Sequence, residues 1–297
     1  MTEDRDHRSG FVGLLGAPNA GKSTLLNRIL GEKVAITSNK PQTTRHRILG
    51  VWTRDDAQVV FLDTPGVHQA KGLLSRELVS QALGVLDDVD LVLFLTEPKS
   101  RQHDEALVIE ALEQTRTPCI VAINKVDTVQ KETLLPIIED YTNRVHPLAT
   151  VPISALKGDN VDALLDEIVK NLPEGPQFYP PDTLTDQPER FIAAEMIREQ
   201  VFRLTGQEIP YATAVTVEAF KEEPKLTRIN AVIHVERDSQ KKIVIGRQGS
   251  KLKEIGTAAR MDIERLTGGK VFLELFVRVH KNWSTDPRAL EEFGYKK

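Results

Sequence analysis

The chain has 297 residues, of which 40% are hydrophobic and 28% are charged. The length predicts about two domains, and the composition is that of a soluble globular protein, which excludes a disordered or fibrous chain. Apolar runs such as Leu91–Leu95 are too short to span a bilayer, and the polar residues 1–10 exclude a secretory signal peptide. Peripheral membrane contact is left open.

The net charge of −4 is divided unevenly along the chain. Residues 1–188 carry 19 basic and 27 acidic side chains, whereas residues 189–297 carry 20 basic and 16 acidic ones. We therefore expect a polyanionic partner to bind the C-terminal part of the chain.

A glycine-rich turn, Gly16–Ser23, lies between the first predicted strand, Phe11–Leu15, and the first predicted helix, Thr24–Leu30. Its spacing, Gly-x-x-x-x-Gly-Lys-Ser, is typical of a phosphate-binding loop, in which backbone N–H groups and the helix dipole attract the anion. In this pattern Lys22 bridges the β- and γ-phosphates, and the Ser23 hydroxyl binds Mg²⁺. The turn predicts a bound nucleotide but does not identify its base.

The next segment, residues 33–46, is polar, contains a proline and is predicted to be a long loop. Thr43 or Thr44 is expected to complete the Mg²⁺ shell when this loop closes. Spacing alone does not choose between them, and our site assignment uses Thr44. Predicted strands at 46–53 and 57–62 follow, and the second runs into Asp63-Thr64-Pro65-Gly66. Asp63 can hold Mg²⁺ through water, and the Gly66 N–H can bind the γ-phosphate.

Strands and helices alternate from there to residue 172, which indicates a parallel sheet covered by helices. The expected strands are 91–95, 119–124 and 150–153, and the expected helices are near 73–86, 103–114, 131–145 and 161–171. The Ras-like nucleotide-binding fold, with its mixed, mostly parallel six-stranded sheet, has this pattern and binds ligands where strands end. Cys119, the only cysteine, is expected to pack inside a strand. An intrachain disulfide is therefore excluded, and we expect a cytoplasmic location.

Two further segments favour guanine over adenine. In Asn124-Lys125-Val126-Asp127, the Asp127 carboxylate can accept from guanine N1–H and the 2-amino group, and adenine offers neither donor. Asn124 is expected to bind the base edge and join neighbouring loops, while the Lys125 stem covers the base or ribose. After the last strand, in Ser154-Ala155-Leu156, the Ala155 N–H can donate to guanine O6.

Five prolines between residues 173 and 188 mark a break in the chain. We expect a nucleotide-binding domain over 1–175, a proline-rich linker over 176–188 and a second domain over 189–297. The second domain is predicted to begin with a helix near 189–204 and strands at 212–219 and 229–236. The segment 243–252, a helix to about residue 266, a strand at 271–279 and a short helix near 287–293 follow.

The turn Gly246-Arg247-Gln248-Gly249 fits the loop with which a KH domain clamps about four single-stranded nucleotides. The order helix, strand, strand, helix, helix, strand matches an α+β type II KH domain. Trp283 and Tyr295 either stack bases or pack in the core. The expected RNA contacts are Ile245, Gly246, Arg247, Gln248, Gly249, Ser250, Lys251, Lys253 and Arg260.

Taken together, the motifs resemble the G1 to G5 motifs of the translation-factor-related GTPases. The patterns Gly-x-Pro-Asn-x-Gly-Lys-Ser, Gln-Thr-Thr-Arg-His, Asp-Thr-Pro-Gly, Asn-Lys-x-Asp and Ser-Ala-Leu are similar to those of the Era family. Residues 246–260 and 279–295 resemble the Era C-terminus, so the resemblance covers nearly the whole chain. It implies slow hydrolysis of GTP to GDP and two conformational states that switch RNA engagement. It also implies binding to 16S rRNA near its 3′ end and a role in small ribosomal subunit assembly, by a protein that we expect to be a monomer.

Val67 departs from the Ras pattern, in which a glutamine after the Asp-x-x-Gly segment orients the attacking water. His68 follows, but a lone exposed histidine is more often a bystander than a base. The resemblance to the Era family implies that water is positioned by other means. It also suggests activation by K⁺ with Asn19 as a ligand.

The remaining site assignments follow from these segments. The catalytic residues are Lys22, Thr44, Asp63 and Gly66. The metal ligands are Ser23, Thr44 and Asp63 for Mg²⁺ and Asn19 for K⁺. The GTP contacts are Asn19, Ala20, Gly21, Lys22, Ser23, Thr24, Asp63, Thr64, Pro65, Gly66, Asn124, Lys125, Asp127, Ser154, Ala155 and Leu156.

Other functions are less consistent with the sequence. A structural RNA-binding protein with a vestigial GTP site would not need Lys22, Ser23, Asp63 and Asp127 intact. A tandem GTPase is disfavoured because there is one phosphate-binding motif, and a GTPase for RNA modification is disfavoured because the C-terminus lacks cysteine. The expected location is the cytoplasm, and the inner face of the cell membrane is left open as a second one.

Overall fold

The computed structural model describes residues 7–38, 40–100, 102–206 and 208–296. Its contacts divide the chain into two compact units. The first unit comprises Met1–Ala35, Thr44–Lys71 and Leu78–Asp186, and the second comprises Ile36–Thr43, Gly72–Glu77 and Gln187–Lys297. Two short N-terminal segments therefore belong to the C-terminal unit, which the sequence did not predict.

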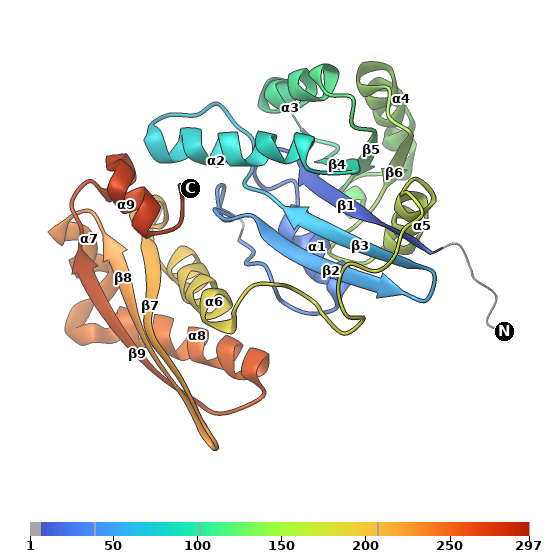
Figure 1. Cartoon of the computed structure of the whole chain (residues 1–297). Coiled ribbons are helices and arrows are strands. Elements are labelled where there is room, and N and C mark those ends of the chain that lie inside the picture. The colour runs from blue at the N-terminus through green and yellow to red at the C-terminus, as the bar shows by residue number, and fades with distance from the viewer. Residues whose placement is uncertain (1–6, 39, 101, 207, 297) are drawn as a thin grey trace. The chain divides into compact units, whose positions relative to one another are not determined.

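A six-stranded sheet forms the centre of the first unit (Figure 1). Its strands are β1 (Arg8–Leu15), β2 (Ile48–Arg54), β3 (Ala57–Asp63), β4 (Leu91–Thr96), β5 (Cys119–Ile123) and β6 (Ala149–Pro152). The order is β2-β3-β1-β4-β5-β6, and only β2 runs antiparallel to its neighbour. The predicted mixed, mostly parallel six-stranded sheet is thus confirmed. Strands β3, β4 and β5 consist of buried residues because helices cover both faces of the sheet.

The helices of the first unit lie in two layers (Figure 1). The second half of α2, α3 and α4 share one buried apolar cluster with the sheet, and α1 and α5 pack on the other face. Cys119 is buried in β5, as predicted, and burial raises the pKa of its thiol to about 12. The helices are α1 (Lys22–Leu30), α2 (Leu73–Leu83), α3 (Gln102–Gln114), α4 (Leu134–Val145) and α5 (Val161–Lys170).

The proline-rich segment expected to be a linker lies along the edge of this sheet. The Val51 N–H on β2 donates to the Leu184 carbonyl over 2.8 Å, and the Thr185 hydroxyl donates to the Leu49 carbonyl over 2.6 Å. The segment therefore occupies part of the free edge of β2, which would otherwise expose unpaired backbone groups.

The second unit contains a three-stranded sheet in the order β7-β8-β9, with β7 (Ala214–Glu223) antiparallel and β9 (Val271–Val279) parallel to β8 (Leu226–Val235). Helices α6 (Glu189–Leu204) and α8 (Ser250–Thr267) share one apolar cluster with the sheet. Two shorter helices, α7 (Asp238–Ile245) and α9 (Pro287–Glu292), complete the predicted α+β order. The predicted strand 212–219 extends to Glu223, because its charged residues pair with β8 across a tight turn.

An aromatic cluster fixes the C-terminal segment of the second unit. The ring centroid of Trp283 lies 5.4 Å from that of Phe293 and 5.7 Å from that of Tyr295, and Phe293 also contacts His234 of β8. Trp283 Nε1 donates to the Ala212 carbonyl over 3.0 Å. Trp283 and Tyr295 are 0% and 2% exposed, so both pack in the core, and the alternative that they stack bases is wrong.

Among the residues that the structure describes, no helix is both long enough and apolar enough to cross a membrane.

Candidate functional site

The phosphate-binding loop has the backbone shape that its glycines allow. It connects β1 to α1, and Gly21 adopts a φ of 101°, which costs little only for glycine. A Cβ at Gly21 would lie 2.1 Å from Nδ2 of Asn124. Asn19 also has a positive φ of 66°, which asparagine tolerates better than most residues. Larger side chains at Gly21 are therefore excluded by both strain and space.

Lys22 lies folded back on this loop. Its ammonium donates to the carbonyl oxygens of Gly16 and Ala17, each over 3.1 Å. Burial lowers the pKa of Lys22 to about 8, and the nearby charge of Asp63 partly offsets that effect. The ammonium thus sits beside the loop, in reach of an anion held by the backbone N–H groups.

Three oxygen-bearing side chains meet beside the loop. Ser23 Oγ donates to Asp63 Oδ2 over 2.6 Å and lies 2.8 Å from Thr44 Oγ1. Asp63 is 0% exposed, and its Oδ1 has no hydrogen-bond partner among the described residues. Burial raises the pKa of Asp63 to about 6, although Lys22 and hydrogen bonds from Ser23 and Thr64 act in the opposite direction. Hard oxygen donors and a bare carboxylate oxygen are what Mg²⁺ requires.

The two threonines that the sequence left undecided differ in position. Thr44 Oγ1 faces Ser23, whereas Thr43 Oγ1 donates to the Lys40 carbonyl over 2.8 Å. The structure therefore brings Thr44, and not Thr43, to the cluster with Ser23 and Asp63.

The Asp-Thr-Pro-Gly segment is attached to the phosphate-binding loop. Thr64 Oγ1 donates to the Leu14 carbonyl over 2.7 Å, and the Val67 N–H donates to the Gly16 carbonyl over 3.1 Å. A Cβ at Gly66 would lie 2.6 Å from the Cα of Pro18, so glycine is required for this close approach. The Val67 side chain is buried in the core shared with α2 to α4, and it presents no polar group to the site.

His68 bends back toward the same segment. Its Nδ1 lies 2.8 Å from the Gly66 carbonyl oxygen. This contact holds the ring on the backbone of the loop.

The segments that distinguish guanine from adenine are joined by hydrogen bonds. Asn124 Nδ2 donates to the Ala20 carbonyl over 2.8 Å, and Asn124 Oδ1 accepts from the Ala155 N–H over 2.9 Å. The Ala155 N–H, assigned to guanine O6, thus donates to Asn124 in this structure. Asp127 Oδ1 accepts from the Ser154 hydroxyl over 2.7 Å. The base-binding segments are therefore held to one another and to the phosphate-binding loop.

Lys125 adopts a φ of 64° and pairs with Glu97. Leu156, at the end of the last motif, is largely exposed.

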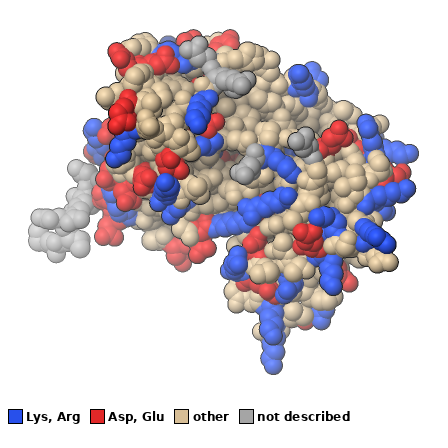
Figure 2. Space-filling model, turned by 180° about the vertical axis from the view of Figure 1, so that it is seen from behind, with Lys and Arg blue, Asp and Glu red and all other residues tan. Residues whose placement is uncertain are grey.

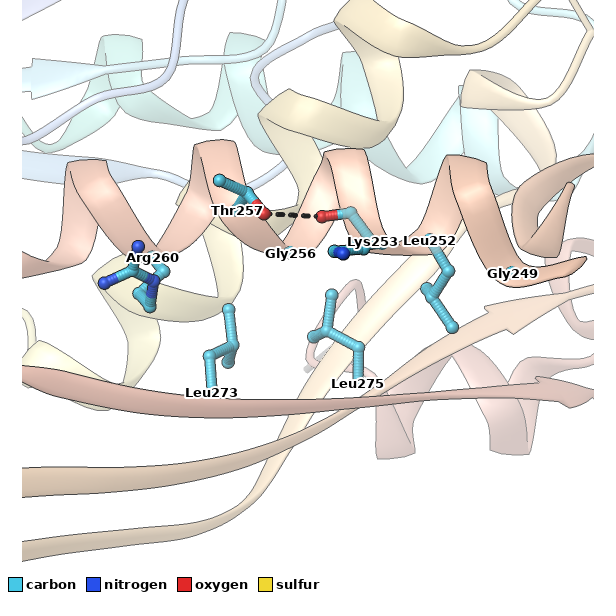
Figure 3. Close-up of a pocket in the computed structure, with 8 residues that line it drawn as sticks. All are labelled: Gly249, Leu252, Lys253, Gly256, Thr257, Arg260, Leu273 and Leu275. Carbon is cyan, nitrogen blue, oxygen red and sulfur yellow. Dashed lines mark hydrogen bonds between the residues drawn. The ribbon is translucent and has the colours of Figure 1, made fainter.

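A groove of about 380 Å³ lies between α8 and β9 in the second unit (Figure 3). One wall is formed by Gly249 and one face of α8, and the other is formed by two leucines of β9. Of the residues expected to contact RNA, the groove includes Gly249, Lys253 and Arg260. The lining residues that the sequence analysis missed are Leu252, Gly256, Thr257, Leu273 and Leu275.

Two sequence signals could have identified these lining residues. Gly256 interrupts a long helix, where glycine costs about 1 kcal/mol relative to alanine, and a Cβ there would lie 3.3 Å from Leu275. Alternation along β9 places Leu273 and Leu275 on the face opposite the exposed Phe272 and Phe276.

The Gly246–Gly249 turn leads directly into this groove. Gly246 and Gly249 have φ values of 73° and 79°, and Gln248 also has a positive φ of 52°. Arg247 and Gln248 are exposed at the tip of the turn. Figure 2 shows further Lys and Arg side chains over the second unit, with Asp and Glu among them.

Comparisons with known proteins agree with this geometry. The chain matches the profile of the 50S ribosome-binding GTPases over residues 11–125 and the KH domain profile over residues 208–284. GTPase Era of Geobacter metallireducens is 55% identical over 295 residues, which cover 98% of this chain and 99% of the relative. GTPase Era of Syntrophus aciditrophicus is 52% identical over 292 residues, which cover 97% and 95%.

Two solved structures match nearly the whole chain. Each has a TM-score of 0.94 and 40% identity, and covers 98% of this chain and 100% of its own. One is Era in complex with MgGDPNP and nucleotides 1506–1542 of 16S ribosomal RNA, and the other is a variant of Aquifex aeolicus Era bound to GDP and AlF4⁻.

The buried Asp63 carboxylate predicts a pH-dependent difference in stability between the parent and Asp63→Asn. The folded pKa of about 6 lies above the ordinary value of 3.8, so the folded state binds more protons between pH 4 and 6. The free energy of unfolding of the parent therefore falls as pH rises through this window. The gain of Asp63→Asn over the parent should grow by up to about 3 kcal/mol from pH 4 to pH 6.5.

Urea unfolding in EDTA measures this difference. Asp55→Asn, in the exposed turn between β2 and β3, is the matched control. A gain for Asp63→Asn that is the same at every pH contradicts the prediction.

Proposed function

Because the chain belongs to the family of GTPase Era, we propose that it binds GTP with Mg²⁺ in its first unit and hydrolyses it to GDP and phosphate. We further propose that its second unit binds 16S rRNA near the 3′ end during assembly of the small ribosomal subunit. The observation that carries the proposal is the meeting of Ser23, Thr44 and the bare Asp63 Oδ1 beside a phosphate-binding loop.

The chain's own residues bind and orient the phosphates. Lys22 exchanges the Gly16 and Ala17 carbonyls for phosphate oxygens, and the Gly66 N–H donates to the γ-phosphate. Ser23, Thr44 and Asp63 hold Mg²⁺, directly or through water. The metal supplies positive charge that neutralises the phosphate oxygens as the leaving bond breaks.

Asp127 and Ala155 make the contacts with the guanine base. Asp127 Oδ1 is already held by Ser154, which fixes the carboxylate for the guanine N1–H and 2-amino group. The Ala155 N–H is shared between Asn124 Oδ1 and guanine O6. A base without these donors leaves the partly buried Asp127 carboxylate without two of its partners, which disfavours adenine nucleotides.

RNA binding is assigned to the groove between α8 and β9. Leu273 and Leu275 give the groove an apolar wall for bases, while Lys253 and Arg260 supply positive charge for phosphates. The Gly246–Gly249 turn binds the sugar–phosphate backbone of the RNA at the mouth of the groove. The protein acts as a monomer in the cytoplasm, and vesicle flotation tests the membrane contact that the sequence leaves open.

Lys22→Ala should abolish multiple-turnover phosphate release, because it removes the cation nearest to the transferred phosphoryl group. We expect a loss of at least about 100-fold in kcat, or roughly 3 kcal/mol. Phosphate release under excess GTP measures it. Unchanged turnover would support the competing function, a structural RNA-binding protein with a vestigial GTP site.

We also propose that K⁺ activates GTP hydrolysis. We assign Asn19 of the phosphate-binding loop as a K⁺ ligand, because Val67 supplies no polar group and added positive charge near the phosphates would stabilise the transition state. Turnover should be at least about tenfold higher in KCl than in NaCl of equal ionic strength. Asn19→Ala should remove the difference, and equal rates in both salts contradict the assignment.

The double substitution Lys253→Ala with Arg260→Ala should weaken binding of a single-stranded oligonucleotide from the 16S rRNA 3′ end by about tenfold or more. It should also reduce the slope of log affinity against log salt concentration by about one to two, because fewer counterions are released on binding. Fluorescence anisotropy at several salt concentrations measures both quantities.

The matched control is Lys221→Ala with Arg288→Ala, two exposed residues of the same unit outside the groove. GTP hydrolysis without RNA should be unchanged in both pairs. Equal losses of RNA affinity in the two pairs would show that general charge, and not the groove, binds the RNA.

A further inference from the structure

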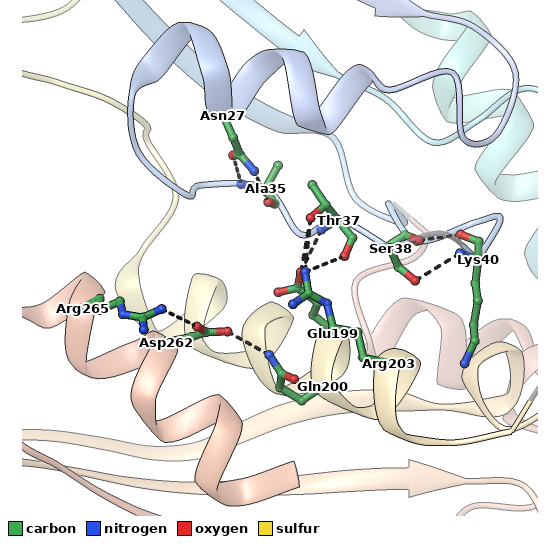
Figure 4. A network of polar contacts seen from close by, with 11 residues as sticks. Asn27, Ala35, Thr37, Ser38, Lys40, Glu199, Gln200, Arg203, Asp262 and Arg265 are labelled. Carbon is green, nitrogen blue, oxygen red and sulfur yellow. Dashed lines mark hydrogen bonds and ion pairs between the residues drawn. The ribbon is translucent and has the colours of Figure 1, made fainter. Parts of the chain in front are cut away.

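The segment Ile36–Thr43 has unusual contacts for its place in the sequence. It lies between α1 and β2, yet its contacts place it in the second unit. Among them are hydrogen bonds to α6 at three points, two of which involve residues shown in Figure 4.

The first point is Thr37. Its N–H donates to Glu199 Oε1 over 3.2 Å, and Arg203 Nη2 donates to the same carboxylate oxygen over 2.6 Å (Figure 4). Glu199 is fully buried, so its charge requires such donors.

The second point is Lys40. Its ammonium donates to the carbonyl oxygens of Phe202 and Thr205 at the C-terminal end of α6. Helix C-termini leave carbonyl groups unpaired and carry partial negative charge, so a cation is favoured there.

The third point is Arg198, which is 0% exposed. Its Nη2 donates to the Thr43 carbonyl oxygen over 2.5 Å, and its Nε donates to Glu195 Oε1 over 2.8 Å. Burial acts to lower the pKa of Arg198, but Glu195 more than offsets this effect, so the pKa is raised and the guanidinium stays charged. An apolar pair of the same volume often stabilises a protein as well as a buried ion pair does. Packing alone therefore does not account for a charged donor at this place.

The residue after Thr43 belongs to the proposed metal site. Thr44 Oγ1 lies 2.8 Å from Ser23 Oγ, within the first unit. The peptide group between Thr43 and Thr44 is planar and contains the Thr43 carbonyl together with the N and Cα atoms of Thr44. A hydrogen bond that fixes the Thr43 carbonyl therefore also fixes the orientation of these two Thr44 atoms. The direction of the Thr44 hydroxyl depends on that plane.

We infer that Arg198 is a positioning residue for GTP hydrolysis: by holding the Thr43 carbonyl, it directs the Thr44 hydroxyl toward the Mg²⁺ bound with the γ-phosphate. The inference rests on the proposed function. It assigns to a helix outside the nucleotide-binding sequence motifs a part in the hydrolytic site.

A purely structural role for Arg198 makes a different prediction. Loss of a structural contact would lower stability and weaken GTP and GDP binding together. Loss of a positioning contact acts on the triphosphate state, because the loop threonine contacts Mg²⁺ and the γ-phosphate only before hydrolysis. The dependence of hydrolysis on Mg²⁺ separates the two roles.

The test variant is Arg198→Met combined with Glu195→Gln, which removes both buried charges at similar volume. We expect the half-saturating Mg²⁺ concentration for GTP hydrolysis to rise about fivefold or more and kcat to fall about tenfold. The dissociation constant for fluorescent GDP should stay within about twofold of the parent, since that state does not use the Thr44 contact.

Two further variants complete the test. Arg190→Met is the matched control, because Arg190 lies on α6 and Nη2 donates to the Val217 carbonyl over 2.7 Å; its Mg²⁺ dependence should equal the parent's. Arg198→Lys keeps the charge beside Glu195 but offers one donor group, so it should recover part of the loss. If the double variant does not bind GDP, Arg198→Lys decides: a Mg²⁺ requirement raised about twofold or more supports the inference.

The outcomes distinguish the inference from the proposed function. A folded double variant with the parent's Mg²⁺ dependence and kcat overturns the inference alone. A parent chain that releases no more phosphate than Lys22→Ala overturns the proposed function, and the inference with it. Equal loss of GTP and GDP affinity also overturns the inference, because it indicates a structural role.

Discussion

The arrangement of the first unit depends on one buried charge. Asp63 is fully buried at the end of β3, an internal strand of the sheet, and burial raises its pKa to about 6. An isolated carboxylate in such a place is costly unless cations and donors surround it. Lys22, the Ser23 hydroxyl and the Thr64 N–H supply part of this compensation, and under the proposed function a divalent cation at the bare Oδ1 would add the rest. The incompletely compensated carboxylate therefore lowers the stability of the ligand-free protein and raises its affinity for a metal-bound polyphosphate.

The second unit uses one helix for two purposes. Residues 192–202 of α6 are buried on every side, because one face packs in the apolar core and the other binds the segment Ile36–Thr43. Gln200 of α6 donates to Asp262 of α8 over 2.8 Å (Figure 4), and α8 forms a wall of the proposed RNA groove. A helix that contacts both the loop before Thr44 and the groove helix is well placed to link nucleotide state with RNA binding.

The sequence predicted those features that short motifs encode. The six-stranded sheet, the phosphate-binding loop and the order of elements in the KH domain follow from glycine spacing and apolar periodicity, and the structure agrees with them. The choice between Thr43 and Thr44 was not predictable, because the two hydroxyls are adjacent and only the fold of the loop separates them. Trp283 was ambiguous because an aromatic residue near a C-terminus is equally suited to a core or a base. The contact of Arg198 with Thr43 joins residues 155 positions apart, and no local pattern signals it.

RNA affinity in two nucleotide states is the most direct test of the account. Fluorescence anisotropy of a labelled oligonucleotide from the 16S rRNA 3′ end gives the dissociation constant with saturating Mg²⁺ and either a non-hydrolysable GTP analogue or GDP. If the loop before Thr44 and the groove helix are linked through α6, the two constants should differ by about fivefold or more, the lower range for coupled sites. Equal constants, with both nucleotides shown to be bound, would contradict the claim that nucleotide state switches RNA engagement.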